Sequence, residues 1–353
     1  MPFRRKPLTP RTVLVRLPNW VGDIVMALPA LQALRAHDHG TRLVAMARPD
    51  HLEFVRRISV FDEVLPGPSK DVDERWGSWW KVVRTIWTSN FQVAILLAPS
   101  FESALTAFLG GVPIRVGHIA DRRSWLLSHR VAVNADKHRK DEYLDVVKLL
   151  GAEPVSGPVP LRFQLAERRY VDQFFKREGF DQNARPVFVN PAAAKTPRAW
   201  SSERFRQLAE YIADKHQVQV LVHQHPPFRA PTAWPRHPQV RVIEDATLVQ
   251  LGAVIQRCRL YVGNDSGPMH VAAALGIPTV GIYGSSSPGR TSPSGDSNTS
   301  HLAVSSYFSC SPCRERFFED CPSPPSREGR PPCLDEINVD TVAEQVDRLL
   351  MQN

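Results

Sequence analysis

The stretch YVGNDSGPMHVAAALG, residues 261–276, decides the fold class of this chain. Its apolar beginning, polar middle and small-residue end predict a strand, a tight turn and a helix in succession. A helix that begins on small residues presents unpaired backbone N–H groups and the positive end of its dipole. Ser266 can donate to a phosphate oxygen, Gly267 lets the backbone approach it closely, and Pro268 loses no hydrogen bond in the first turn. We therefore expect an α/β unit with a phosphate site at this turn.

A second stretch, PTVGIYGSSS at residues 278–287, repeats the pattern of a strand followed by small residues. Two successive strands then end at one crevice, which is where open α/β sheets bind ligands. The alternative is a pair of ordinary strand–helix turns, because Gly and Ser favour turns.

Strand and helix patterns alternate in both halves of the chain. In the first half, strands are predicted at 12–17, 41–47, 91–97 and 114–117, and helices at 21–36, 103–109 and 141–150. In the second half, strands are predicted at 186–190, 217–222 and 259–262, and helices at 201–212, 247–256 and 339–351. The Pro-rich segment 153–160 predicts a linker. The expected fold is α/β with two doubly wound, Rossmann-like domains.

Composition indicates a soluble globular protein. The 353 residues are 42% hydrophobic and 23% charged, and no apolar run approaches the ~20 residues that span a bilayer. The basic N-terminus is interrupted by proline and lacks the apolar region of a signal peptide, so a cytoplasmic protein is expected. The net charge of +8 suits nucleic acid, anionic lipid headgroups or a phosphorylated substrate, and charge alone does not choose among them.

The first predicted strand is followed by a carboxylate. Residues 14–29 read LVRLPNWVGDIVMALP, which places Asp23 just beyond the strand and near a helix N-terminus. The stretch lacks the Gly-x-Gly-x-x-Gly fingerprint of ordinary dinucleotide sites. Asp23 could be a capping acid or a functional carboxylate of the site.

Several of these motifs together resemble one enzyme family. The segments are 18–23 (PNWVGD), 264–274 (NDSGPMHVAAA), 283–288 (YGSSSP) and 310–313 (CSPC). They occur in the right order over nearly the whole chain. The chain is similar to the lipopolysaccharide heptosyltransferases of glycosyltransferase family 9, and most similar to the heptosyltransferase II branch.

The resemblance implies a GT-B fold, in which two Rossmann-like domains face each other across a cleft. Residues 1–160 would form the acceptor-binding domain, 161–338 the donor-binding domain, and 339–353 a C-terminal helix. The implied reaction is an inverting, metal-independent transfer of heptose from ADP-L-glycero-D-manno-heptose to the lipopolysaccharide inner core. The acceptor would be linked to lipid A at the cytoplasmic membrane surface, with the enzyme peripheral on the inner membrane face and no nucleic acid as partner.

The resemblance also assigns roles to residues. Asp23 occupies the position of the general base, which takes the acceptor proton while the anomeric carbon gains oxocarbenium character. The family's phosphate-binding Lys before a Trp aligns with Arg198 when counted back from Trp200, and Lys195 is a second candidate. The family's acidic ribose contact is not evident at 222–227. The implied donor-binding residues are Lys195, Arg198, Asn264, Asp265, Ser266, Gly267 and His270, and the candidate acceptor-binding residues are Asn19, Trp20, Arg115, Arg122 and Arg123.

Four cysteines lie in the Pro-rich loop 305–335, namely Cys310, Cys313, Cys321 and Cys333. In a cytoplasmic chain they favour a zinc site over disulfides, and free thiols are the alternative. Four Cys ligands would leave no open position, so the zinc would be structural, and no cofactor is expected for catalysis. The segment 75–87 interleaves cations with tryptophans, which suits a membrane interface or an aromatic core under a basic face.

Three other functions stay open on the sequence. They are a family relative that uses another nucleotide sugar, a sugar-nucleotide epimerase of the same fold, and a basic nucleic-acid-binding protein with zinc. The last predicts no role for Asp23 or for the turn at 264–270. The sequence also leaves the acceptor and the oligomeric state undetermined.

Overall fold

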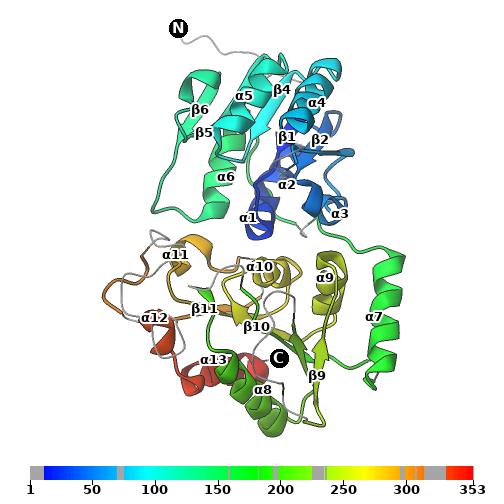
Figure 1. The fold of residues 1–353 in the computed structure, drawn as a ribbon, viewed down its shortest axis with the longest axis vertical. Helices are drawn as coiled ribbons and strands as arrows, with labels where there is room; N and C mark the ends of the chain where they lie inside the picture. Colours follow the sequence, from blue (N-terminus) through cyan, green and yellow to red (C-terminus); the bar gives the residue numbers. More distant parts are fainter. Residues whose placement is uncertain are drawn as a thin grey trace. The chain divides into compact units, whose positions relative to one another are not determined.

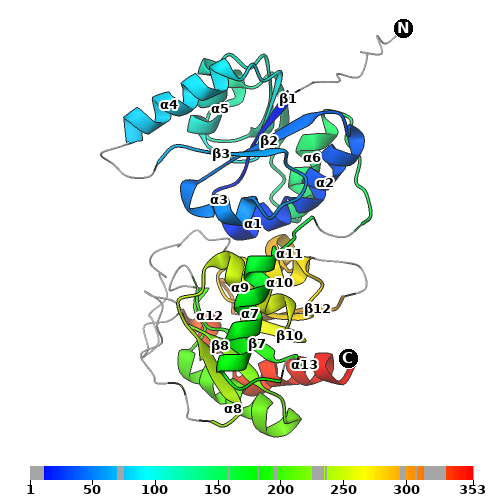
Figure 2. The same cartoon turned by 90° about the vertical axis from the view of Figure 1, so that its right-hand side faces the viewer.

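A computed structural model describes residues 12–69, 75–157, 160–181, 183–193, 198–224, 234, 237–294, 299–306, 308–313 and 331–352. The chain divides into two compact units, Met1–Arg162 and Phe163–Asn353. The boundary expected at 160/161 lies two residues before this division. Each unit is built on one parallel sheet with helices on both faces (Figures 1 and 2).

The first unit contains six parallel strands in the order β3-β2-β1-β4-β5-β6. The strands are β1 (Thr12–Arg16), β2 (Arg42–Ala47), β3 (Glu63–Pro66), β4 (Val93–Leu96), β5 (Ile114–Ile119) and β6 (His129–Ala132). The helices are α1 (Val21–Met26), α2 (Leu28–His37), α3 (Leu52–Val55), α4 (Arg75–Thr88), α5 (Phe101–Leu109) and α6 (Arg139–Lys148), with short 3-10 turns η1 (Pro49–His51) and η2 (Ser124–Leu126). Helices α4 and α5 pack together on one face of the sheet, and α2 packs with α6 on the other (Figure 2).

The second unit repeats this arrangement with the order β12-β11-β10-β7-β8-β9, again all parallel. Its strands are β7 (Val187–Asn190), β8 (Val220–His223), β9 (Val240–Ile243), β10 (Leu260–Asn264), β11 (Thr279–Tyr283) and β12 (His301–Ser305). Its helices are α7 (Leu165–Arg177), α8 (Ser202–His216), α9 (Leu248–Gln256), α10 (Gly267–Ala274), α11 (Pro288–Thr291), α12 (Pro332–Asp335) and α13 (Val339–Gln352). Strands β10 and β11 are buried throughout, as expected for a sheet that is covered on both faces.

Both sheets have the strand order of a Rossmann fold. The order reverses between β1 and β4 in the first unit and between β7 and β10 in the second. Ligands of open α/β sheets bind outside the carboxyl ends of the strands at such a reversal. The predicted α/β class with two Rossmann-like domains is confirmed.

The helix expected over 21–36 is instead two helices. Helix α1 ends at Met26 and α2 begins at Leu28, with Ala27 between them. Pro29 has no N–H for the carbonyl four residues before it, so a continuous helix would lose a hydrogen bond there.

The C-terminal helix α13, which the sequence set apart as 339–353, packs within the second unit. Its residues Val342, Ala343, Val346 and Leu349 join the same core cluster as the apolar side of α8 and strands β7 and β10. The helix therefore covers one face of the second sheet. No helix in the described part of the chain is long and apolar enough to cross a membrane.

Candidate active site

The reversal in the second sheet brings the ends of β7 and β10 side by side. Asn190 at the end of β7 pairs in register with Gly263 of β10. A Cβ at Gly263 would lie 2.8 Å from the carbonyl oxygen of Asn190, so only glycine allows this close approach. The strands thus place Asn190 and Asn264 next to each other, and both side chains are fully buried.

Asn264 positions the loop that follows β7. Its Oδ1 accepts a hydrogen bond from the backbone N–H of Trp200 at 2.9 Å, and its Nδ2 donates to the carbonyl of Pro191 at 2.8 Å. Because Arg198 lies between these two contacts in the sequence, the amide of Asn264 holds both described ends of the loop that carries it. Lys195 lies outside the described residues, and Arg198 lies within them.

The carboxylate of Asp265 lies close to two other predicted residues, His270 and Arg198. Its Oδ1 lies 3.5 Å from Nε2 of His270, and its Oδ2 lies 3.8 Å from Nη1 of Arg198 and accepts a hydrogen bond from the hydroxyl of Thr291 at 3.4 Å. Burial alone would raise the pKa of Asp265, but His270 and Arg198 outweigh it and hold that pKa below its ordinary value. Asp265 is therefore ionised at neutral pH and orients Arg198.

Ser266 and Gly267 begin α10 at the edge of this cluster. Ser266 is the N-cap residue, yet its side chain makes no capping bond, and its Oγ accepts from Nδ2 of Asn190 at 3.2 Å. Both residues are partly exposed. The first turn of α10 is thus open beside Arg198, Asp265 and His270, as a phosphate site requires.

Asn190 and His223 are site residues that the sequence reasoning did not select. Oδ1 of Asn190 lies 2.9 Å from Nδ1 of His223, and its Nδ2 also donates to the hydroxyl of Tyr261 at 2.8 Å. The signal for Asn190 was available, because it is a polar residue that ends an apolar strand at a predicted switch point. His223 ends β8 and is buried.

In the first unit, Asp23 follows β1 in the first turn of α1 and is partly exposed. Its Oδ1 accepts a hydrogen bond from the hydroxyl of Tyr143 at 3.0 Å and lies 3.6 Å from Nε of Arg139. Burial, with the charge of Asp23, raises the pKa of Tyr143, so that its hydroxyl stays protonated as a donor. Helix α6 therefore holds the carboxylate of Asp23 in place.

Arg139 is itself fixed by a buried acid. Its Nη1 lies 3.0 Å from Oε2 of Glu142, which is almost fully buried. Sequence reasoning missed Arg139 and Tyr143 because they lie more than a hundred residues from Asp23, and no local pattern links them.

The two predicted acceptor residues before Asp23 lie in the β1–α1 loop. Oδ1 of Asn19 accepts from Nη2 of Arg16 at 2.9 Å, and its carbonyl lies 3.1 Å from Nε2 of His51. Burial lowers the pKa of Arg16 to about 10, which leaves it charged at neutral pH. Trp20 is more than half exposed, so an acceptor can reach its ring.

The structure gives Arg123, a predicted acceptor-binding residue, a buried structural position instead. Arg123 has no exposed surface, and its guanidinium donates to the carbonyls of Leu96, Ala98, Ser100 and His118 and to the hydroxyl of Ser103. Burial lowers the pKa of Arg123 to about 10, so it is protonated at neutral pH and crosslinks the loops at the ends of β4 and β5.

The guanidinium of Arg115 also makes most of its contacts within the first unit. Its guanidinium donates to the carbonyl of Leu126 at 2.6 Å, contacts that of Val112, and lies 5.2 Å from the ring centroid of Phe108. Arg122 is exposed and has a left-handed backbone with a φ of 54°. Of Arg115, Arg122 and Arg123, only Arg122 has no structural role in the described contacts that competes with the prediction that it binds the acceptor.

The cysteines of loop 305–335 differ in their surroundings. Cys310 is exposed and Cys333 is buried, while the sulfur of Cys313 lies 3.6 Å from the carbonyl of Ser285. Cys321 lies outside the described residues. Within the described residues, no three His, Cys, Asp or Glu side chains are grouped to hold a metal ion. A structural zinc remains a prediction, and elemental analysis of purified protein tests it.

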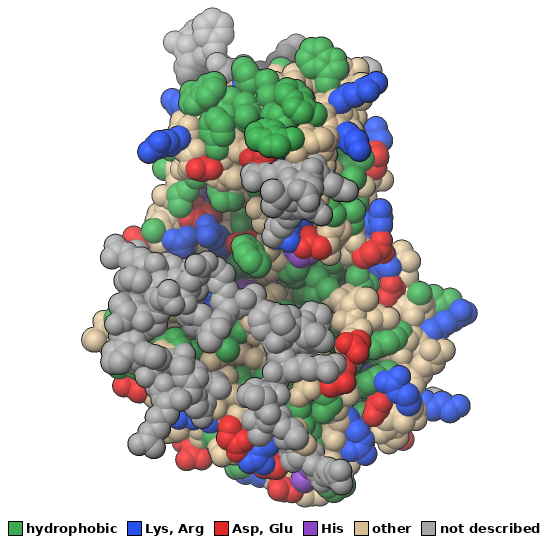
Figure 3. Space-filling view, in the orientation of Figure 1, with side chains coloured by type: hydrophobic (Ala, Val, Ile, Leu, Met, Phe, Trp, Pro, Cys, Tyr) green, Lys and Arg blue, Asp and Glu red, His purple; other side chains and the backbone are tan. Residues whose placement is uncertain are grey.

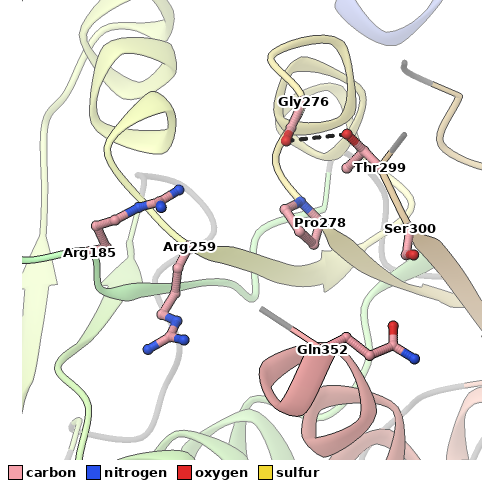
Figure 4. Close-up of a pocket in the computed structure, with 7 residues that line it drawn as sticks. All are labelled: Arg185, Arg259, Gly276, Pro278, Thr299, Ser300 and Gln352. Atoms are coloured by element: carbon pink, nitrogen blue, oxygen red, sulfur yellow. Dashed lines mark hydrogen bonds between the residues drawn. The ribbon is translucent and has the colours of Figure 1, made fainter. Parts of the chain in front are cut away.

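A pocket of about 580 Å³ lies at the opposite edge of the second sheet (Figure 4). Its lining comes from segments that precede β7, β10, β11 and β12 and from the end of α13, namely Arg185, Arg259, Gly276, Pro278, Thr299, Ser300 and Gln352. The guanidinium groups of Arg185 and Arg259 point away from each other, and none of the predicted donor-binding residues lines the pocket. The candidate site is therefore at the carboxyl ends of the strands.

Two Rossmann-like units, each with polar residues at its strand reversal, are the architecture of the GT-B glycosyltransferases. The family model described as "Glycosyltransferase family 9 (heptosyltransferase)" matches residues 79–319. The chain belongs to this family.

Similar proteins agree with the family. Lipopolysaccharide heptosyltransferase 2 of Escherichia coli K12 is 26% identical over 309 residues, which cover 80% of this chain and 85% of the relative. Lipopolysaccharide core heptosyltransferase OpsX of Haemophilus influenzae is 22% identical over 299 residues, which cover 80% of this chain and 82% of the relative.

Two solved structures share the fold. The glycosyl transferase family 9 protein from Veillonella parvula has a TM-score of 0.81 at 20% identity and covers 97% of this chain and 98% of its own. The ADP-heptose LPS heptosyltransferase II of E. coli has a TM-score of 0.75 at 22% identity and covers 97% of this chain and 99% of its own. These likenesses establish the GT-B fold over nearly the whole chain.

Proposed function

We propose that this glycosyltransferase moves heptose from ADP-L-glycero-D-manno-heptose to the inner core of lipopolysaccharide, with inversion at the anomeric carbon. The family and its heptosyltransferase 2 relatives support the sugar and the acceptor class. The observation that carries the proposal is the open first turn of α10 beside Arg198, Asp265 and His270, because this arrangement suits a diphosphate.

The donor would bind to the second unit. Arg198 offers a planar fork of N–H donors that fits phosphate oxygens, and Asp265 and Asn264 hold this side chain and its loop in place. The backbone N–H groups that begin α10 would face the same phosphates. Negative charge builds up on the diphosphate as it leaves, and these donors would stabilise it in the transition state.

The base would be Asp23 in the first unit. Its carboxylate takes the proton of the acceptor hydroxyl while that oxygen forms a bond to the anomeric carbon and the bond from that carbon to the diphosphate oxygen breaks, releasing ADP. Tyr143 and Arg139 contact only one of its oxygens in the described contacts. They orient the carboxylate, and partial exposure gives the acceptor access to it.

The reaction would need no metal ion, because Arg198 and the start of α10 supply the positive charge that a divalent cation provides in other glycosyltransferases. The acceptor would be linked to lipid A, with the enzyme at the cytoplasmic face of the inner membrane. The net charge of +8 suits such an anionic acceptor and surface.

A transfer assay tests the proposal. Purified protein is incubated with ADP-heptose and a deacylated inner-core oligosaccharide, and ADP release and the mass of the product are measured. Parallel reactions with other ADP-, UDP- and GDP-sugars distinguish a relative with a different donor. An epimerase would convert a sugar nucleotide without any acceptor, so donor conversion in its absence would contradict transfer.

Replacing the base is the sharpest test of the mechanism. Asp23→Asn keeps the size and polarity of the side chain but cannot accept the proton, so we expect kcat to fall by ~10²–10⁴-fold with ADP affinity unchanged. Asp136→Asn changes an exposed aspartate of the same unit and is the control. A near-normal kcat for Asp23→Asn would remove this residue from the mechanism.

A further inference from the structure

Helix α4 (Arg75–Thr88) presents three tryptophans along one exposed stripe. Trp76, Trp80 and Trp87 are 73%, 56% and 64% exposed. At 3.6 residues per turn these positions fall within about 40° of one another around the helix axis. Exposed tryptophans are rare on soluble proteins. Three of them in line on one helix form an exposed apolar surface, which is typical of a site that a partner covers.

The side of α4 that flanks the stripe is firmly packed, so the stripe is held in place. Trp79 is buried, and its Nε1 donates to the hydroxyl of Thr106 in α5 at 2.7 Å. A Cβ at Gly110 would lie 2.4 Å from Cγ2 of Ile86, so the end of α5 approaches α4 too closely for any other residue. The alternative considered from the sequence, an aromatic core under a basic face, holds for Trp79 but not for the other three tryptophans.

The apolar surface continues beyond α4. A Cβ at Gly111 would lie 3.0 Å from the ring of Trp87, which places that ring against the end of α5. Phe108 of α5 is 6.4 Å from the ring of Trp125 in η2, and Trp125 is 67% exposed. We call this surface the aromatic patch: Trp76, Trp80, Trp87, Phe108, Leu109 and Trp125.

Positive side chains border the aromatic patch. Lys81 and Arg84 are exposed on α4 next to the stripe, and the guanidinium of Arg115 lies over the ring of Phe108. Figure 3 shows hydrophobic side chains gathered where Figure 1 draws α4 and α5, with Lys and Arg side chains at the margin. Tryptophan rings with neighbouring cations are the composition of surfaces that lie in the headgroup region of anionic membranes.

We propose that the aromatic patch docks the first unit onto an anionic phospholipid bilayer. The tryptophan rings enter the headgroup region, and Lys81 and Arg84 pair with lipid phosphates. This deepens the proposed function, because a membrane-docked acceptor unit meets an acceptor that is itself anchored in the bilayer. A protein partner or a second copy of this chain would need matching acidic groups around an apolar centre, whereas the anionic bilayer supplies both at once.

Vesicle cosedimentation tests docking without donor or acceptor. The full chain should bind vesicles of phosphatidylethanolamine and phosphatidylglycerol, bind phosphatidylcholine vesicles much more weakly, and lose binding as salt rises. The triple variant Trp76→Ser, Trp80→Ser and Trp87→Ser should bind the anionic vesicles at least about 100-fold more weakly. The double variant Lys81→Gln and Arg84→Gln should weaken binding by roughly 25-fold, about fivefold for each basic residue.

The control is Leu165→Ser, which changes an exposed apolar side chain on α7 of the second unit and should leave vesicle binding unchanged. Melting curves confirm that each variant is folded. Unchanged vesicle binding by both patch variants would overturn the proposal. A loss of self-association with unchanged vesicle binding, measured by sedimentation, would assign the aromatic patch to a second copy and overturn it as well.

The transfer assay separates this proposal from the proposed function. The patch variants should keep wild-type activity on a soluble, deacylated acceptor and lose activity on the lipid-linked acceptor in vesicles. Equal activity of patch variants and wild type on both acceptors would also refute docking, while transfer itself would stand.

Discussion

Arg123 should stabilise the first unit and take no part in binding the acceptor. Its guanidinium donates to four backbone carbonyls and one hydroxyl in a place without solvent access. Arg123→Ala would remove this donor from all five acceptors. The carbonyls of Ala98 and Ser100 still accept from the hydroxyl of Ser103, and each buried group that stays unsatisfied costs ~1–3 kcal/mol. The desolvation of the guanidinium, which the variant avoids, offsets part of this.

The net loss should be about 3–5 kcal/mol, because several buried acceptors lose a donor at ~1–3 kcal/mol each. For a unit of this size that corresponds to a fall in Tm of about 10 °C. Arg123→Lys keeps the charge but not the planar fork of donors, so its Tm should lie between those of the wild type and the alanine variant. Arg122→Ala is the matched control, because the neighbouring side chain is exposed and its removal should change stability by less than about 0.5 kcal/mol.

Calorimetry should follow the unfolding of the first unit as a transition of its own, because a chain of two units need not unfold in one step. Transfer kinetics on the soluble acceptor should be measured at a temperature where the variant is folded. The reasoning fails if Arg123→Ala melts with the wild type and raises the KM for the acceptor.

Three further predictions concern the donor site, the metal requirement and the response to pH. Arg198→Ala should weaken ADP binding in calorimetric titrations by roughly 10–150-fold, because a hydrogen bond to a charged group contributes about 1.5–3 kcal/mol. Lys195→Ala should weaken ADP binding less. The reverse order of the two variants would show that the alignment through Trp200 is wrong. Transfer should continue in excess EDTA without added Mg²⁺, and activity that EDTA abolishes and Mg²⁺ restores would refute metal-independent transfer. Burial lowers the pKa of His118 from 6.5 to about 4, so the unfolded chain binds a proton that the folded unit does not, and stability should fall as the pH drops from 6.5 towards 4. His118→Gln should reduce this fall in urea unfolding at pH 7 and pH 5, and an unchanged pH dependence would exclude the contribution of His118.

Local sequence patterns were sufficient to predict the class of fold and to propose part of a candidate donor site. The alternation of apolar strands and amphipathic helices predicted two Rossmann-like units, because both periods are local properties of the chain. The turn at 264–270 was predicted for the same reason, since Asp265, Ser266 and His270 are adjacent in sequence and are placed by one strand and one helix. Arg198 could be assigned to the candidate donor site because counting back from Trp200 places it at the position of the family's phosphate-binding Lys.

Contacts between segments that are distant in the sequence could not be predicted from it. It could not show that Tyr143 and Arg139 hold Asp23, that Asn190 and His223 join the candidate donor site, or that Arg123 is buried. An arginine is charged and most often exposed, so composition pointed to a surface role, and only the ring of carbonyls that the folded loops bring together makes burial favourable.

The sequence by itself thus determined the α/β class, the two Rossmann-like units and the residues that begin α10, whereas β3, β6, β9 and β12 were not predicted. The tertiary structure decided which face each side chain of α4 presents, with Trp79 buried against Thr106 and Trp76, Trp80 and Trp87 exposed. The physical reason is that hydrophobicity favours burial of every tryptophan equally, while the close packing of α5 against α4 leaves room for one of the four.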